Sequence, residues 1–229
     1  MPVISKSSYR KRPFYLINGH METVVPSLFR KVKGVEYERE RLELEDGDFL
    51  DLDWLKGGNE RLLIVSHGLE GNSDRHYVKG TAKYFHERGW DVLAWNYRSC
   101  SGEMNRLPRM YHHGVTDDLE AVINHGLSQG YKEANLVGFS MGGSTTLKFL
   151  GEQGSQVDAR ITGAAVFSVP CNLWDSAVQL TKKSNNFYKN RFLNKLKKKV
   201  AQKAEMYPDI INTEGLDKMT SFSEFDERY

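Results

Sequence analysis

Residues 134–143 read ANLVGFSMGG, and this stretch decides how the rest of the chain is interpreted. Residues 134–139 form a short apolar run of the kind that makes a buried strand. Residues 141–151 follow as a helix, and Gly138 and Gly142 flank Ser140 in a G-x-S-x-G pattern. A tight strand-to-helix turn needs small residues two positions before and after the serine. We therefore predict a sharp turn that holds the Ser140 hydroxyl above a sheet, at the N-terminus of a helix, where backbone N–H groups favour an anion.

Short apolar runs of the same type recur on both sides of this stretch. The predicted strands and helices alternate along the chain: strands at 62–66, 91–97 and 161–168, helices at 73–88 and 117–129. This alternation predicts an α/β fold, with a mostly parallel sheet that carries helices on both faces.

Capping residues set the expected ends of two of these helices. Ser73 and Thr116 precede them as N-caps, and Gly89 follows the first as a residue that can end a helix. Asp117 and Asp118 favour the positive end of the second helix.

A β-hairpin is predicted ahead of the first buried strand. Residues 35–44 and 48–55 flank the turn Asp46-Gly47, and an Asp-Gly pair between two such runs is a strong hairpin signal. The second run alternates strictly, with three apolar residues on one face and two acids on the other: Leu50, Leu52 and Trp54 against Asp51 and Asp53.

Composition excludes several classes of protein. The 229 residues hold 32 basic and 30 acidic side chains, a net charge of only +2, which does not indicate a nucleic-acid partner. No apolar run approaches the roughly 18 residues of a membrane span, and residues 14–17 are too short for a signal peptide core. Cys100 and Cys171 are too few for a disulfide framework or a cysteine zinc site.

We expect a cytoplasmic protein with no metal and no cofactor, built as an extension (1–34), a core (35–168) and a helical cap (169–229).

A second glycine-rich motif, His67-Gly68-Leu69-Glu70-Gly71, directly follows the strand 62–66. In a hydrolase of this topology, this loop supplies one of the two backbone donors that stabilise a developing oxyanion. The predicted donors are the N–H groups of Leu69 and Met141, each worth about 3–4 kcal/mol in the transition state. His67 is interpreted as a residue that orients the loop by a hydrogen bond, with Gly68, Gly138 and Gly142 as further support.

Several segments together resemble the YheT-like branch of the α/β-hydrolase superfamily. The matching residues span most of the chain: Asn18 to Thr23, His67 to Asp74 with His76 and Tyr77, Trp95 to Arg98, Ser101 to Glu103 with Asn105 and Arg106, Tyr111 and His112, Asp117 and Asp118, and Gly138 to Gly143. Ser99 departs from the family, whose members usually carry glycine there. The resemblance implies hydrolysis of carboxylic esters through an acyl-enzyme, with some relatives acting on lipid-like acyl substrates.

The resemblance also implies a catalytic acid and a histidine on loops after two further strands, in the order Ser, Asp or Glu, His. No histidine follows His125, and neither strand is visible in the sequence. We therefore expect the chain to stop inside the cap region, before these two residues.

Substitutes for the missing base and acid are few. His112 and His113 lie in the loop before the helix 117–129, at the same sheet edge as Ser140, although packing at the helix start is the simpler interpretation. His20 has a similar standing, whereas His76, His86 and His125 are interpreted as ordinary helix residues. Asp175 is the one candidate acid, and a solvated position at a helix start is its simpler interpretation.

The segment 182–203 holds nine Lys or Arg and no acid, with Tyr188, Phe192, Leu196 and Val200 repeating every four residues. This pattern predicts an amphipathic basic helix. Its simpler interpretation is a cap helix over the active-site mouth with its lysines in water; the alternative is a weak attraction to anionic lipid surfaces.

Three hypotheses about function follow. The first is a serine hydrolase that acts on carboxylic or acyl-lipid esters through Ser140, and the second is a non-catalytic remnant or binding module that keeps the pocket. The third, a lesser one, is a peripheral membrane-binding protein that works through the basic helix. The strand 161–168 should also form an exposed sheet edge. We expect the chain to be poorly soluble or to dimerise through this edge, unless the basic helix 182–203 folds back over it.

Overall fold

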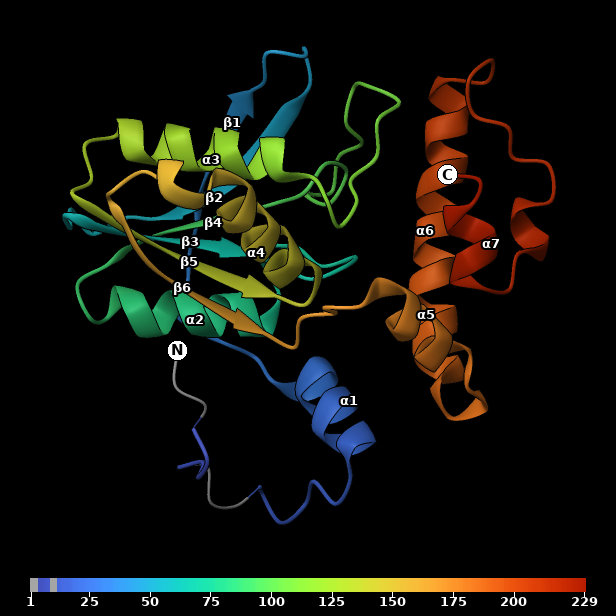
Figure 1. Cartoon of the computed structure of the whole chain (residues 1–229), viewed down its shortest axis with the longest axis horizontal. Helices are drawn as coiled ribbons and strands as arrows, with labels where there is room; N and C mark the ends of the chain where they lie inside the picture. The colour runs from blue at the N-terminus through green and yellow to red at the C-terminus, as the bar shows by residue number, and fades with distance from the viewer. Residues whose placement is uncertain (1–3, 9–11) are drawn as a thin grey trace.

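The computed structural model describes residues 4–8 and 12–229, with a six-stranded sheet at its centre (Figure 1). The strands are β1 Glu38–Glu43, β2 Phe49–Leu55, β3 Arg61–Ser66, β4 Asp91–Trp95, β5 Glu133–Phe139 and β6 Ile161–Phe167. Their order across the sheet is β1-β2-β4-β3-β5-β6. β4, β3, β5 and β6 run parallel, while β2 pairs antiparallel with both β1 and β4. The predicted hairpin and the mostly parallel sheet are confirmed.

Helices cover both faces of this sheet, as predicted (Figure 1). The seven α-helices of the described residues are α1 Gly19–Phe29, α2 His76–His86, α3 Thr116–Ser128, α4 Met141–Gln153, α5 Leu173–Thr181, α6 Asn186–Met206 and α7 Phe222–Asp226. α2 packs on one face, and α3 and α4 pack on the other. None of the described helices has both the length and the apolar character needed to cross a membrane.

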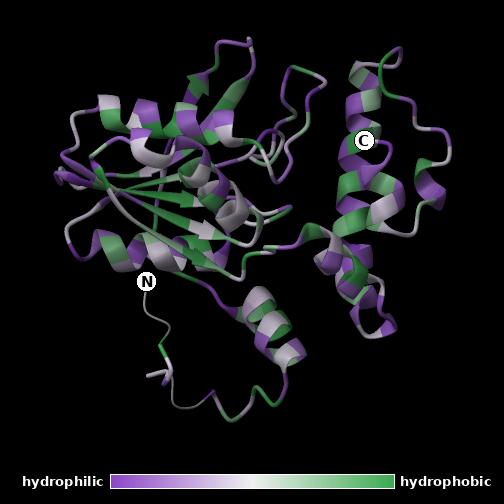
Figure 2. Cartoon of the chain, in the orientation of Figure 1, coloured by the Kyte–Doolittle hydropathy of each residue, from purple (hydrophilic) through white to green (hydrophobic). Residues whose placement is uncertain are grey.

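The core lies in two layers, one on each side of the sheet, because alternate side chains of a strand point to opposite faces. In β3, Leu62 and Ile64 join the layer beneath α3 and α4, whereas Leu63 and Val65 join the layer against α2. The central strands are accordingly apolar on both faces, and Figure 2 shows them as mainly green arrows.

The acidic face of β2 is buried as fully as its apolar face. Asp51 and Asp53 are 3% and 2% exposed, because β2 is an interior strand with β1 on one side and β4 on the other. Arg41 pairs with Asp51 and Arg39 with Asp53, each with a closest contact of 2.8 Å. These ion pairs satisfy carboxylates that would otherwise be costly to bury.

Both predicted N-caps are wrong. α2 begins at His76 after Arg75, and Ser73 instead donates a hydrogen bond of 2.5 Å to the buried Asp53 carboxylate. α3 begins at Thr116 after Val115, and the Thr116 hydroxyl donates to Glu152 at 2.8 Å. In both cases the hydroxyl donates a charge-assisted hydrogen bond to a carboxylate from elsewhere in the fold and accepts none from the helix N-terminus.

Helices α5 to α7 enclose a third apolar cluster, built around Leu193, Val200 and Phe222. α6 begins four residues later than the predicted basic helix and ends at Met206. It lies at the carboxyl ends of the parallel strands, against the loops that leave β3 and β4. These helices therefore lie at the end of the sheet where the strands terminate and Ser140 emerges.

Candidate active site

Ser140 occupies a strained turn between β5 and α4. Its φ of +52° and ψ of −117° lie in a region that residues other than glycine rarely adopt. The turn is held by a 2.8 Å hydrogen bond from the Ser140 N–H to the Phe167 carbonyl oxygen of β6. Such strain persists only where the surroundings enforce it, and here it directs the serine away from the end of the strand.

The glycines around Ser140 are required by close backbone contacts. A β-carbon on Gly138 would lie 2.5 Å from the Gly142 carbonyl oxygen, and one on Gly142 would lie 2.3 Å from the Ser66 carbonyl oxygen. No β-carbon fits at either distance, so α4 can approach β3 and β5 only because these positions lack side chains.

The loop 67–71 lies directly against this turn, since a β-carbon on Gly68 would be 3.3 Å from the Ser140 β-carbon. Three of the four amides from 68 to 71 are engaged: Gly68 N–H donates to the Tyr77 hydroxyl at 3.1 Å, Glu70 N–H to the Tyr111 hydroxyl at 3.2 Å, and Gly71 N–H to the Gly68 carbonyl at 2.9 Å. Within the described residues the Leu69 amide has no acceptor, and neither does that of Met141, the first residue of α4.

His67 is fully buried and supports this loop from inside. Its Nδ1 lies 2.8 Å from the Gly68 carbonyl oxygen and must donate the proton, while Nε2 accepts from the Tyr97 N–H at 3.3 Å. Burial lowers the pKa of His67 to about 3, so the ring stays neutral. Both nitrogens are committed to backbone groups, which is the orienting arrangement expected from the sequence.

A pocket of about 350 Å³ opens beside Ser140, between α1, α2 and α6. Its walls are mainly aromatic and apolar: Leu69, Tyr77, Phe139, Phe167, Tyr188 and Phe192. Arg75, His76 and Arg191 add polar groups to the lining. An apolar pocket with a few polar groups is the usual form of a small-molecule site.

The histidines are arranged differently from the sequence interpretation. Neither His112 nor His113 lines the Ser140 pocket; the His112 ring accepts a hydrogen bond from Gly114 N–H at 3.1 Å, close to the start of α3. His20 reaches the pocket only through Tyr188, whose hydroxyl lies 2.9 Å from His20 Nδ1. The simpler interpretation of helix-start packing fits His112.

His76, interpreted from the sequence as an ordinary helix residue, does line the Ser140 pocket. Burial, with the positive charges of Arg30 and Arg75, lowers the pKa of its imidazole. Its place as the first residue of α2, after the loop that leaves β3, was the signal that could have identified it. No histidine of the described residues forms a hydrogen bond with the Ser140 hydroxyl.

Asp175 is exposed in the first turn of α5 and does not line the pocket, in line with its simpler interpretation. Across the described residues, no group of three His, Cys, Asp or Glu side chains is placed to hold a metal ion.

Three lysines of α6 depart from the expectation that the lysines of this helix lie in water. Lys203 is fully buried and donates to the carbonyl oxygens of Asn105 and Leu107. Lys199 pairs with the Glu70 carboxylate at 2.8 Å, and Lys195 donates to the Glu70 carbonyl at 3.1 Å. Loop carbonyls without partners in the sheet need donors, and these lysines supply them. The cap is therefore attached by polar bonds to the loop that flanks Ser140.

Comparisons with known proteins agree with this geometry. Residues 57–221 match the family model described as "Serine aminopeptidase, S33". The Escherichia coli protein named "Putative esterase YheT" is 34% identical over 92% of this chain and 63% of its own length. Phospholipase ABHD3 of Homo sapiens is 28% identical over the whole of this chain and 58% of its own length. The chain thus spans about three fifths of the length of these two relatives.

Solved structures support the fold. The Pyrococcus furiosus esterase Pf2001 superposes on 64% of this chain and 56% of its own, with a TM-score of 0.53 and 22% sequence identity. A protein of Agrobacterium vitis titled "Putative hydrolase" gives the same TM-score at 12% identity, over 69% of this chain.

Proposed function

The chain belongs to the α/β-hydrolase superfamily, within the family described as serine aminopeptidase S33, and from that membership we propose that it is a serine hydrolase of carboxylic esters. Ser140 is the nucleophile, and the N–H groups of Leu69 and Met141 are the oxyanion donors. One observation supports the proposal most directly: Ser140 has a strained backbone and lies beside two amides that have no acceptor within the described residues. The names of the relatives, esterase and phospholipase, point to the same chemistry.

In the proposed reaction, the Ser140 hydroxyl oxygen attacks the ester carbonyl and loses its proton to a base. The carbonyl oxygen becomes an oxyanion, and each of the two amides stabilises it by roughly 3–4 kcal/mol. The intermediate then expels the alcohol and leaves an acyl group on Ser140, which water removes. The aromatic walls of the pocket suit an acyl chain, which makes acyl-lipid esters the favoured substrate class.

A second candidate function rests on the Ser140 hydroxyl, which no histidine of the described residues contacts. A pocket without a base binds an acyl compound but does not turn it over. In this role the chain is a binding module, and the Ser140 side chain is dispensable for its ligand.

A mass measurement separates the two candidates. After incubation with a p-nitrophenyl acyl ester at alkaline pH, we expect an acyl adduct on Ser140 to accumulate. p-Nitrophenolate is a good leaving group, so acylation proceeds slowly without a base, whereas the unactivated alkyl ester formed on Ser140 is hydrolysed far more slowly without one. Ser140→Ala should lose the adduct, and Ser168→Ala, at another serine of the same pocket, should keep it. An equal adduct in Ser140→Ala would contradict the nucleophile assignment; no adduct in any variant, together with retained binding, would favour the module.

Turnover of the same ester by each molecule should stay slow, so that at low protein concentration the observed rate barely exceeds spontaneous hydrolysis. Enzymes without their triad keep roughly 10³–10⁴-fold catalysis over water, from the oxyanion hole and substrate binding. A rate of several per second, abolished in Ser140→Ala, would mean that a base is present. Single alanine variants of His20, His76, His112 and His113 would then identify it.

We also propose a cytoplasmic location, supported by the two free thiols, Cys100 and Cys171. A weak contact of residues 182–203 with anionic lipid is a lesser proposal, since Lys195, Lys199 and Lys203 already bond to protein groups.

A further inference from the structure

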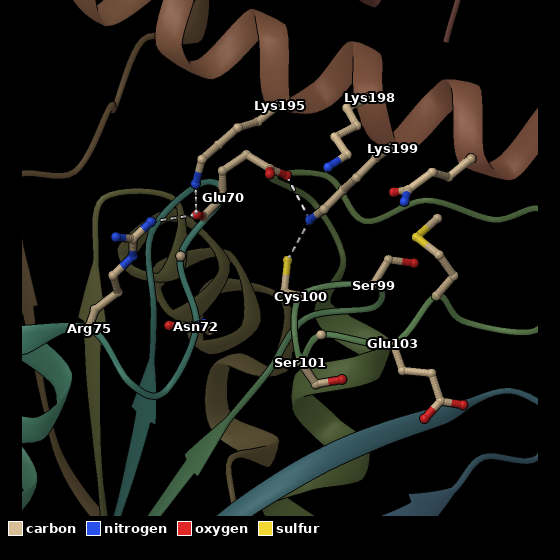
Figure 3. Close-up of a pocket in the computed structure, with 14 residues that line it drawn as sticks. Glu70, Asn72, Arg75, Ser99, Cys100, Ser101, Glu103, Lys195, Lys198 and Lys199 are labelled. Atoms are coloured by element: carbon tan, nitrogen blue, oxygen red, sulfur yellow. Dashed lines mark hydrogen bonds and ion pairs between the residues drawn. The ribbon is translucent and has the colours of Figure 1, made fainter.

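A second cavity, of about 330 Å³, lies between the loop that leaves β3, the loop that leaves β4, and α6 (Figure 3). It adjoins the Ser140 pocket, because Gly71 and Arg75 line both. Neither Ser140 nor Leu69 lines it, so the proposed ester chemistry gives it no role.

Positive charge dominates its lining. Arg75, Lys195, Lys198 and Lys199 face two carboxylates, those of Glu70 and Glu103. Figure 3 shows that Glu103 points away from α6, and it pairs with Arg41 at 2.7 Å. Both acids of the cavity are therefore already partnered, since Glu70 accepts from Lys199 at 2.8 Å and from the Tyr111 hydroxyl.

Three cationic side chains of the cavity have no carboxylate partner. Within the part of the chain that the structure describes, Arg75, Lys195 and Lys198 have no carboxylate within 4.0 Å. Arg75 and Lys195 each donate once to the Glu70 carbonyl, at 3.1 Å, which leaves further N–H groups on both. Burial and the charges of Arg75, Arg191 and Lys199 lower the pKa of Lys195, although Glu70 opposes this, as expected where cations crowd together.

We propose that this cavity is a phosphate-binding site, in which Arg75, Lys195 and Lys198 hold the anion. A phosphate carries more than one negative charge at neutral pH and has several acceptor oxygens. It can therefore form ion pairs and hydrogen bonds with three cations at once, which a single carboxylate cannot. The planar guanidinium of Arg75 matches two phosphate oxygens at once. The hydroxyl of Ser99 and the amide of Gln202 also line the cavity and can donate to the other oxygens.

Calorimetric titration of the full chain with inorganic phosphate, at an ionic strength fixed with sodium chloride, tests the site. Lys198 is exposed and has no bond to other described groups, so Lys198→Gln should fold normally. We expect it to weaken phosphate binding roughly tenfold, the value of one charge-assisted hydrogen bond. Lys189→Gln, on the same helix but outside the cavity, should bind as the unchanged chain does. Arg75→Gln, with folding checked by circular dichroism, should weaken binding at least as much.

The source of the phosphate is decided by a second comparison. If sn-glycerol 3-phosphate competes with inorganic phosphate and vesicles containing phosphatidic acid do not, the ligand is a small soluble phosphate. If the vesicles compete and Arg75→Gln abolishes that competition, the ligand is a lipid head group. The proposal is overturned if phosphate gives no more heat than the chloride control, or if Lys198→Gln and Arg75→Gln both bind as the unchanged chain does. Because binding is the readout, this test does not depend on Ser140.

Discussion

At the scale of single residues, hydrogen bonds to the loop 67–71 fix the candidate oxyanion site. The Tyr77 and Tyr111 hydroxyls accept from the amides on either side of Leu69, and His67 holds the Gly68 carbonyl. These contacts leave one amide of the loop for a ligand. The loop's shape therefore depends on the neutral form of a buried imidazole.

The His67 pKa predicts a pH dependence of stability. Since burial lowers it from 6.5 to about 3, the unfolded chain takes up a proton below pH 6.5 that the folded chain refuses. Stability should fall as pH drops below 6.5, by about 2 kcal/mol at pH 5 from this group, and the loss should level off below pH 3. Urea unfolding of His67→Gln from pH 7 to pH 5 should lack this component. An equally steep decline in the variant would assign the effect to other groups.

Single residues were only partly predictable from the sequence. Gly138, Ser140 and Gly142 could be recognised because the constraint on them is local to one turn. The tyrosines that support Leu69 could not, because Tyr111 acts 41 positions from Glu70. Ser99, interpreted as a small departure from the family, has a φ of +59°, which explains why glycine suits this position better.

At the scale of elements, short apolar runs and one alternating segment of the sequence identified the strands, and a four-residue period identified the basic helix. The ends of elements and the faces of α6 were less predictable, because they depend on partners from distant loops. Lys203 follows Lys195 and Lys199 at intervals of four residues, so the sequence places it on the lysine-rich face of α6. It is nevertheless fully buried, and its ammonium group donates to carbonyl groups of the loop 98–107. A lysine-rich face does not reveal which ammonium groups find such acceptors.

Lys203 should therefore be important for docking of the cap. Lys203→Met keeps most of the apolar stem but leaves the Asn105 and Leu107 carbonyls without their donor. We expect the free energy of unfolding to fall by about 1–3 kcal/mol, the cost of unsatisfied buried groups. Limited proteolysis should cut within α6 sooner than in Lys189→Met, the matched control on the same helix. Equal protection of the two variants would contradict this role.

At the scale of the whole molecule, β6 forms an open edge of the sheet. It pairs with β5 alone, and Ala164, Ala165 and Phe167 are exposed along it. The basic segment does not cover this strand, since the contacts of α6 lie at the loops after β3 and β4. An uncovered strand presents free N–H and C=O groups to other chains.

Light scattering of the purified chain should accordingly show dimers or larger species. Ala164→Lys places a charge on the edge and should shift the population toward monomer, because charged residues discourage edge pairing. Ala201→Lys, exposed on α6, is the control and should leave the association unchanged. A monomeric unchanged chain, or association that Ala164→Lys does not weaken, would show that this edge is not used.

The crowded turn around Ser140 also has a consequence for how relatives of this protein can evolve. Its shape depends on the glycines on either side of the serine, where no β-carbon fits, and not on the serine's own oxygen atom. A lineage could therefore lose its chemistry through a single substitution at position 140 and inherit the turn, the sheet and the aromatic pocket intact. Substitution at Gly142 would break the scaffold itself. In such a lineage catalytic activity is lost more easily than the fold, so the pocket can be retained in proteins that no longer catalyse the reaction.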